Sequence, residues 1–218
     1  MRRPRIPPML SMLVQTAIAA CDGVVFDSRA SCPLCGGALA GYDTKQKQFA
    51  VLREGDTVRT VRVKVRRFSC RQCSAVCFAD EPFYPATRIG SPVVDLCLTL
   101  AESMPFSRAA TYLDELGIVV DRMTVRNYAR RRFPRVATAD VFGIRLPLSV
   151  ISLSSLSTEI SEGGCIKGAE ALAACGFPSA ERAPLQPALP RKERDERDEH
   201  ERDKERDTRY PEKDREQQ

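Results

Sequence analysis

Two cysteine pairs constrain the fold of this 218-residue chain more than any other feature. The first pair is Cys32-Pro-Leu-Cys35 and the second is Cys70-Arg-Gln-Cys73, with 34 residues between them. Two C-x2-C pairs supply the ligands of a tetrahedral zinc ion, and a site of four thiolates has no open position for a substrate. The sequence therefore predicts one structural zinc ion bound by Cys32, Cys35, Cys70 and Cys73.

Other assignments of the cysteines remain open at this point. Cys21 and Cys77 could each replace one ligand, although Cys77 is also explained as a small packed apolar side chain. A redox role would place the pair ahead of a helix in a thioredoxin-like unit, whereas Cys70 ends a predicted strand. The chain has nine cysteines, and an odd number in paired motifs favours metal thiolates in the reducing cytoplasm over disulfides.

The segment between the pairs has the period of a half-buried strand. Three valines alternate there with three basic residues: Val61, Arg62, Val63, Lys64, Val65 and Arg66. Residues 54–56 predict the preceding turn, and residues 49–52 the partner strand. We expect a zinc ribbon, in which this hairpin returns the second cysteine pair to the first.

The N-terminus predicts a helix that packs on the following module. A basic start precedes an apolar stretch at 9–20, and residues 18–21 imitate the cleavage site of a lipoprotein signal. Polar residues interrupt the stretch, which favours an amphipathic helix over export. No run reaches the about 20 apolar residues of a membrane span, so we expect no membrane association.

After Pro85 the apolar period becomes helical. Ser91-Pro92 predicts the start of a first helix that ends before Pro105, and Ser107 predicts the cap of a second that Gly117 ends. Asp121 predicts the cap of a third helix that runs to about Phe133. Three helices with a basic last one match a helix-turn-helix layout.

The third predicted helix is rich in groups that contact DNA. It has no acidic residue after Asp121, and Val125, Tyr128 and Ala129 form its expected buried stripe. Arginine and asparagine read base edges or bind phosphate, and a basic strand adds a phosphate track. The predicted DNA contacts are Arg122, Thr124, Arg126, Asn127, Arg130 and Arg131 on the helix and Arg62, Lys64 and Arg66 on the strand.

A family resemblance rests on these motifs. Cys-Pro-Leu-Cys-Gly-Gly, the basic strand that ends in residues 66–73, Phe78 and the helix-turn-helix resemble the N-terminal part of prokaryotic insertion-sequence transposase-like proteins, over about residues 30–135. The resemblance implies binding to double-stranded DNA. In such transposases a catalytic domain of the RNase H type follows, in which three carboxylates hold two metal ions.

The rest of the chain departs from that pattern. Residues 134–190 contain five acids, Asp140, Glu159, Glu162, Glu170 and Glu181, and are too short for the sheet that would bring three of them together. We therefore expect no enzymatic activity and no small-molecule substrate. The apolar run at 141–156 predicts one strand or buried segment, residues 169–174 one helix, and the prolines that follow a linker.

The last 28 residues repeat Glu-Arg-Asp with no apolar face, which predicts a disordered or solvated-helix tail. The predicted fold class is α+β: a small zinc ribbon, a three-helix helix-turn-helix module and a poorly structured C-terminal region. The predicted segments are 1–30, 31–86, 87–136, 137–190 and 191–218. Alternative functions are an RNA-binding or scaffold protein that uses the tail, and a transcriptional regulator; a homodimer stays open.

Overall fold

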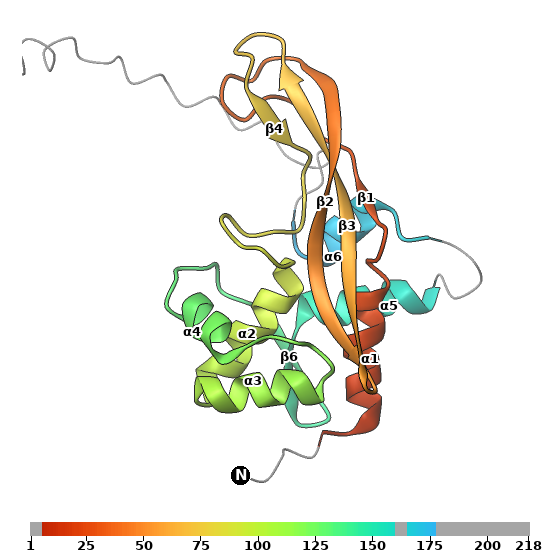
Figure 1. Cartoon of the computed structure of the whole chain (residues 1–218), viewed down its shortest axis with the longest axis vertical. Helices are drawn as coiled ribbons and strands as arrows, with labels where there is room; N and C mark the ends of the chain where they lie inside the picture. Colours follow the sequence, from red (N-terminus) through yellow and green to blue (C-terminus); the bar gives the residue numbers. More distant parts are fainter. Residues whose placement is uncertain (1–5, 160–164, 178–218) are drawn as a thin grey trace, which may run out of the picture. The chain divides into compact units, whose positions relative to one another are not determined.

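The computed structural model describes residues 6–159 and 165–177, which form six helices and two sheets. The elements are, in chain order, α1 (Pro8–Ala19), β1 (Val25–Phe26), β2 (Leu39–Glu54), β3 (Thr57–Cys70), β4 (Val76–Phe78), α2 (Ser91–Ser103), α3 (Phe106–Glu115), α4 (Arg122–Ala129), β5 (Thr138–Val141), β6 (Ile144–Pro147), α5 (Leu148–Glu159) and α6 (Gly168–Ala174) (Figure 1).

The larger sheet is built on the long β2–β3 hairpin. Its register runs from Glu54 opposite Thr57 to Leu39 opposite Cys70, and β1 (parallel) and β4 (antiparallel) both pair with β3. Gly55 forms the tip with φ 63°, a conformation that glycine adopts without strain. The predicted turn and alternation are confirmed: the three valines of 61–65 are buried, and Arg62, Lys64 and Arg66 are exposed.

The predicted N-terminal helix is also confirmed. α1 buries Leu10, Val14, Ala17 and Ile18, which recur at helical spacing. Its main packing partner is α5, and not the module that directly follows it as predicted; both helices contribute to the same apolar core as the hairpin. Within the described residues, no helix is long and apolar enough to cross a membrane.

The three helices predicted after residue 90 exist as α2, α3 and α4, with shifted ends. Gly90 and Pro105 occupy the positions before α2 and α3, so Ser91 and Ser107 lie inside the helices and do not cap them. Asp121 caps α4 as predicted, because its side chain accepts a hydrogen bond from the Thr124 amide. α4 ends at Ala129, four residues before the predicted Phe133.

The predicted fold class, a zinc ribbon followed by a separate helix-turn-helix module, is wrong. The connection between α3 and α4 pairs with the hairpin, since the Val119 amide donates to the Val51 carbonyl and the Arg53 amide to the Gly117 carbonyl. α2 packs against α5 and β6 as well as against α3 and α4. The valines of β3 require apolar cover, and the helices provide it in one shared core.

The described part of the C-terminal region, residues 138–159 and 165–177, is more ordered than predicted. The apolar run at 141–156 forms neither one strand nor one buried segment: it contains most of the β5–β6 hairpin, whose turn is Phe142-Gly143, and most of α5. The helix predicted at 169–174 is confirmed as α6. The predicted proline linker and the charged tail fall in 178–218, outside the described residues.

Candidate metal centre and basic surfaces

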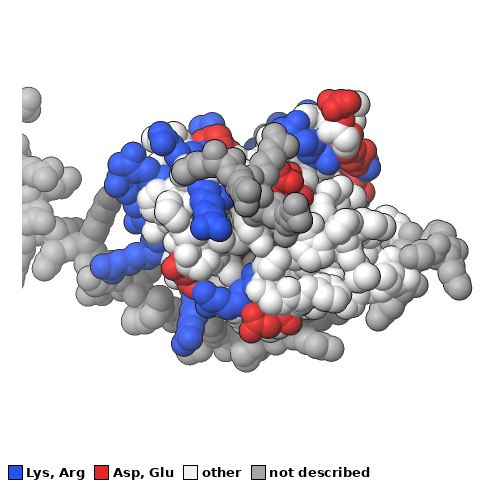
Figure 2. All heavy atoms as spheres, turned by 90° about the horizontal axis from the view of Figure 1, so that it is seen from below, with Lys and Arg blue, Asp and Glu red and all other residues white. Residues whose placement is uncertain are grey.

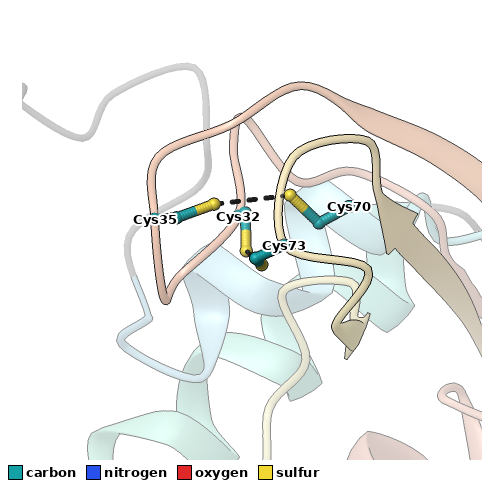
Figure 3. A group of neighbouring side chains, drawn as sticks. All are labelled: Cys32, Cys35, Cys70 and Cys73. Carbon is teal, nitrogen blue, oxygen red and sulfur yellow. Dashed lines mark hydrogen bonds between the residues drawn. The ribbon is translucent and has the colours of Figure 1, made fainter.

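The four cysteines of the two C-x2-C pairs come together at the end of the β2–β3 hairpin that lies away from Gly55. Cys32 and Cys35 lie in the turn before β2, Cys70 ends β3, and Cys73 lies in the turn before β4 (Figure 3). Their Sγ atoms all lie within 4.8 Å of one another, with 3.6 Å between Cys32 and Cys73 and 3.4 Å between Cys35 and Cys70.

The two turns repeat the same backbone hydrogen bonds. The Gly36 amide donates to the Cys32 carbonyl and the Cys32 amide to the Gly37 carbonyl, at 2.9 and 3.0 Å. In the second turn the Ser74 amide donates to the Cys70 carbonyl and the Cys70 amide to the Ala75 carbonyl, at 3.0 and 2.9 Å. Gly36 and Ser74 are equivalent, with φ of 72° and 58°. Each turn therefore aims two sulfur atoms into one space.

The donor set fits a soft divalent metal ion. Four sulfur atoms about 2.3 Å from a tetrahedral ion would lie about 3.8 Å apart, close to the two shorter separations observed. Sulfur ligands select such ions over Mg²⁺ or Ca²⁺. The cluster can therefore hold one metal ion with no position left for a substrate.

The electrostatics of the cluster also favour a cation. The Cys73 and Gln72 amides donate to Cys70 and lower the pKa of its thiol to about 6, and the Leu34 amide lowers the pKa of Cys32. The Gly37 amide acts in the same direction on Cys35, but the neighbouring Cys70 and Cys73 sulfur atoms outweigh it and raise that pKa to about 12. A bound cation would remove this repulsion between thiolates.

The two alternative ligands do not join the cluster. Cys21 is buried in the core, where burial raises the pKa of its thiol to about 12. Cys77 lies on β4, and burial raises the pKa of its thiol as well. Among the described residues, the grouping of metal-ligating side chains contains Cys32, Cys35, Cys70 and Cys73 alone.

Of the predicted DNA contacts on α4 and just after it, some side chains are hydrogen-bonded within the fold and others have no partner in the described residues. Val125 and Tyr128 are buried and Ala129 is half-buried, as the predicted stripe requires. Thr124 Oγ1 donates to Asp121, and Arg131 donates to the Pro85 and Ala86 carbonyls, so both side chains are engaged in the fold. Arg122, Arg126, Asn127 and Arg130 have no hydrogen bond or ion pair from their side chains within the described residues.

The charged side chains at this end of the molecule lie mostly on one side. Figure 2 shows lysine and arginine, with a few acidic side chains among them, on the side that carries α4, while the side of α1 and α5 is largely uncharged. Arg145 of β6 lies 3.9 Å from Glu102 of α2. The arginines of α4 form no ion pair with an acid of the described residues.

On the hairpin, some of the basic side chains of β3 are paired with acids and others are free to contact phosphate. Arg59 pairs with Asp22 at 2.8 Å, and Arg67 pairs with Asp43. Arg62, Lys64 and Arg66 have exposed side chains with no ion pair within the described residues. The Arg66 guanidinium lies close to Gly41 of β2. A Cβ atom added at Gly41 would be only 2.6 Å from Arg66 Nη2.

The sequence did not indicate a pocket of about 450 Å³ beside β4. Charged side chains of Arg29, Lys47, Asp80 and Glu81 line it together with aromatic rings. Arg29, Lys47 and the adjacent Asp80 and Glu81 come from three distant parts of the chain and form no motif. One sequence signal was available: Arg29 shortly precedes Cys32, and Glu81 shortly follows Cys73. A metal site that joins the two cysteine pairs would bring Arg29 and Glu81 close together.

Comparisons with protein-family models, with curated proteins and with solved structures give no match. The resemblance to insertion-sequence transposase-like proteins thus stays a prediction from the sequence. The physical features of the site carry the functional argument.

Proposed function

We propose that the protein binds double-stranded DNA through the arginines of α4, of which Arg122 and Arg130 are exposed and Arg126 is half-buried, and that a structural zinc ion organises its hairpin. The observation that carries the proposal is the α4 row of Arg122, Arg126 and Arg130. Side chains four residues apart lie on the same side of a helix, so the three guanidinium groups, the last just past the helix end, form one row. No acid of α4 neutralises the row.

Binding to a polyanion explains this unbalanced charge. Guanidinium groups bind phosphate through paired N–H donors, and each neutralised phosphate releases counterions. Asn127 lies beside the row and offers both a donor and an acceptor to a base edge. Arg62, Lys64 and Arg66 form a second exposed row, spaced by about 6.6 Å along β3, and supply a further phosphate contact.

Zinc is the proposed metal because the four sulfur ligands favour it and it has no redox chemistry of its own. When bound, the ion would supply structure rather than catalysis. Cys32 and Cys35 would fix the chain before β2, and Cys70 and Cys73 the chain before β4. Reduced thiolates require a reducing compartment, which agrees with the cytoplasmic location expected from the sequence.

The experiment is fluorescence anisotropy of a labelled DNA duplex with zinc-loaded protein over a range of salt concentrations. The triple variant Arg122→Gln, Arg126→Gln, Arg130→Gln should weaken binding and reduce the slope of log affinity against log salt by about 2.7, if each arginine contacts one phosphate. Arg59→Gln is the matched control, since that arginine is paired with Asp22, and should change the slope little.

Two results would overturn the proposal. One is no binding to duplex DNA at low salt with zinc present. The other is an unchanged salt slope in the triple variant. The variant Arg62→Gln, Lys64→Gln, Arg66→Gln measures the hairpin contribution separately.

A further inference from the structure

The end of the larger sheet near the cysteine cluster carries exposed aromatic side chains on one face. Tyr42 of β2 is 61 % exposed, and Val76 and Phe78 of β4 are 47 % and 36 % exposed. Phe78 lies opposite Arg67 in the register, so both side chains lie on the same face of the sheet as the buried valines of β3. Figure 1 shows this end of the hairpin and β4 projecting away from α2, α3 and α4. The described residues therefore leave this part of the face largely uncovered.

A β-bulge turns Tyr42 toward this face. Gly41 of β2 pairs with Phe68 of β3. The next pair along the strands is Asp43 with Arg67, which leaves Tyr42 as an extra residue of β2. An extra residue in one strand reorients its side chain while the ladder continues on both sides. The Tyr42 ring therefore lies next to Arg67.

Arg67 is held against two aromatic rings. Its Cζ atom lies 5.2 Å from the centroid of the Tyr42 ring and 5.9 Å from that of Phe78. Its Nε and Nη2 atoms donate to the two carboxylate oxygens of Asp43, and such a paired contact fixes the plane of the guanidinium group. Lys47 Nζ lies 4.5 Å from the Phe78 centroid. These contacts hold the rings in place before a ligand binds, which lowers the entropy cost of stacking on them.

The chain around these rings is basic. Residues 28–44 and 66–79 contain four arginines and one acid, Asp43. This excess is larger than the two negative charges that four thiolates around one Zn²⁺ ion would leave. Arg66 and Arg71 have exposed side chains that form no ion pair within the described residues. This end of the molecule therefore favours an anionic partner over a neutral one.

We propose that Tyr42, Arg67 and Phe78, called the aromatic platform below, bind single-stranded DNA by stacking on its unpaired bases. Every base has a planar π face, and an exposed ring such as that of Tyr42 stacks on any of them. The bases of a duplex are already stacked on one another, so the platform would select an unpaired strand. The unpaired arginines at this end would contact its phosphates. The choice of DNA over RNA rests on the proposed binding of duplex DNA.

The first experiment uses the wild-type, zinc-loaded protein and three labelled oligomers of about ten nucleotides, with binding followed by fluorescence anisotropy. Oligo(dC) should bind about tenfold more tightly than an abasic DNA strand of the same length, because the abasic strand keeps the phosphates and lacks the bases. Equal affinity for the two strands would overturn the proposal. Absence of binding to either would also overturn it and would leave the platform to a protein partner. Tighter binding of oligo(C) RNA than of oligo(dC) would overturn the assignment to DNA.

The second experiment compares two substitutions of Tyr42. Tyr42→Leu keeps an apolar side chain without a ring and should weaken oligo(dC) binding about tenfold, whereas Tyr42→Phe keeps the ring and should bind as the wild type does. Val58→Ala, at another exposed apolar side chain of the hairpin, is the matched control and should leave the affinity unchanged. Zinc content and circular dichroism show that each variant is folded. Equal affinities of Tyr42→Leu and Tyr42→Phe would contradict the proposal.

The two nucleic-acid proposals fail in different ways. Tyr42→Leu should keep the wild-type affinity for duplex DNA, and the α4 triple variant should keep the preference for oligo(dC) over the abasic strand. Loss of duplex binding alone would therefore contradict the role of α4, and loss of the oligo(dC) preference alone would contradict the role of the aromatic platform.

Discussion

The two halves of the β2–β3 hairpin are stabilised in different ways. The proximal half, residues 45–54 and 57–65, buries Phe49, Ala50 and Leu52 and the three valines of β3 in the apolar core. The distal half, residues 39–44 and 66–70, buries only Cys70. The same antiparallel ladder thus continues from a region with a core into one without a core.

The difference explains why the cysteine cluster lies where it does. A two-stranded hairpin without a packed face is marginally stable in water. In the distal half the strands have little apolar surface to bury, and polar side chains such as Thr44 and Arg66 are exposed there. A metal ion held by four thiolates would replace the missing core.

The largest expected effect comes from removing two ligands. In Cys35→Ser, Cys70→Ser, bound zinc measured by mass spectrometry should fall from one ion per chain to none, because two sulfur ligands cannot complete the tetrahedron. The far-ultraviolet circular dichroism of the helices should be kept. Retention of one zinc ion by this variant would contradict the claim that the four cysteines hold a metal ion that stabilises the distal half.

A valine of the proximal half should show the opposite behaviour. Val63→Ala should lower the free energy of unfolding by about 2 kcal/mol, because it leaves a cavity in the core, and should not change zinc content. Urea denaturation measures the effect. Val58→Ala is the matched control: Val58 lies on the same strand with its side chain exposed, and its loss should change stability by less than about 0.5 kcal/mol.

The buried Asp95 of α2 sharpens the comparison through pH. It is 4 % exposed and accepts hydrogen bonds from Tyr84 and Ser149. Burial raises the pKa of Asp95, so the folded protein holds this proton more tightly than the unfolded chain does. Its contribution to stability is therefore fully present below the ordinary carboxyl pKa and is lost as pH rises through the raised pKa.

Asp95→Asn should accordingly be more stable than the wild type at pH 7, by about 1 kcal/mol, the scale of one buried hydrogen-bonded group. The advantage should shrink as the pH falls through the raised pKa of Asp95, because the wild-type carboxyl then becomes protonated. Urea denaturation at pH 7 and at lower pH measures it, and zinc affinity should not change. An advantage that grows as the pH falls would have the wrong sign.

The smallest effect is expected in the cysteine turns. Gly36→Ala should weaken zinc binding about fivefold, because a left-handed residue with a Cβ costs about 1 kcal/mol. Ser74→Gly, at the equivalent position of the second turn, should strengthen it slightly. Competition with a chelator measures both affinities; a stronger effect of Ser74→Gly than of Gly36→Ala would contradict the equivalence of the turns.

The sequence predicted the features that depend on neighbouring residues. The alternation at 61–66, the turn at Gly55, the Asp121 cap and the left-handed Gly117 that follows α3 all follow from local chemistry. The cysteine cluster could also be predicted, because ligand spacing encodes it directly.

The features that depend on distant pairing could not be predicted. Residues 118–120 were expected to be a connection inside a helix-turn-helix, but they pair with β2, about 65 residues earlier. In the apolar run at 141–156, β-branched residues and serines satisfy a strand and a helix equally well, and packing against α1 and α2 decides between them. The acids that neutralise Arg59 and Arg67 are likewise distant in the chain.

The most direct test of the difference between the two halves is amide hydrogen exchange before and after zinc is removed with a chelator. Removal should abolish protection of the amides at 66–78 and 39–44 while those at 45–53 and 58–65 keep theirs, because the core holds the proximal half without metal. Unchanged protection of the distal half, or loss of protection along the whole hairpin, would contradict the account.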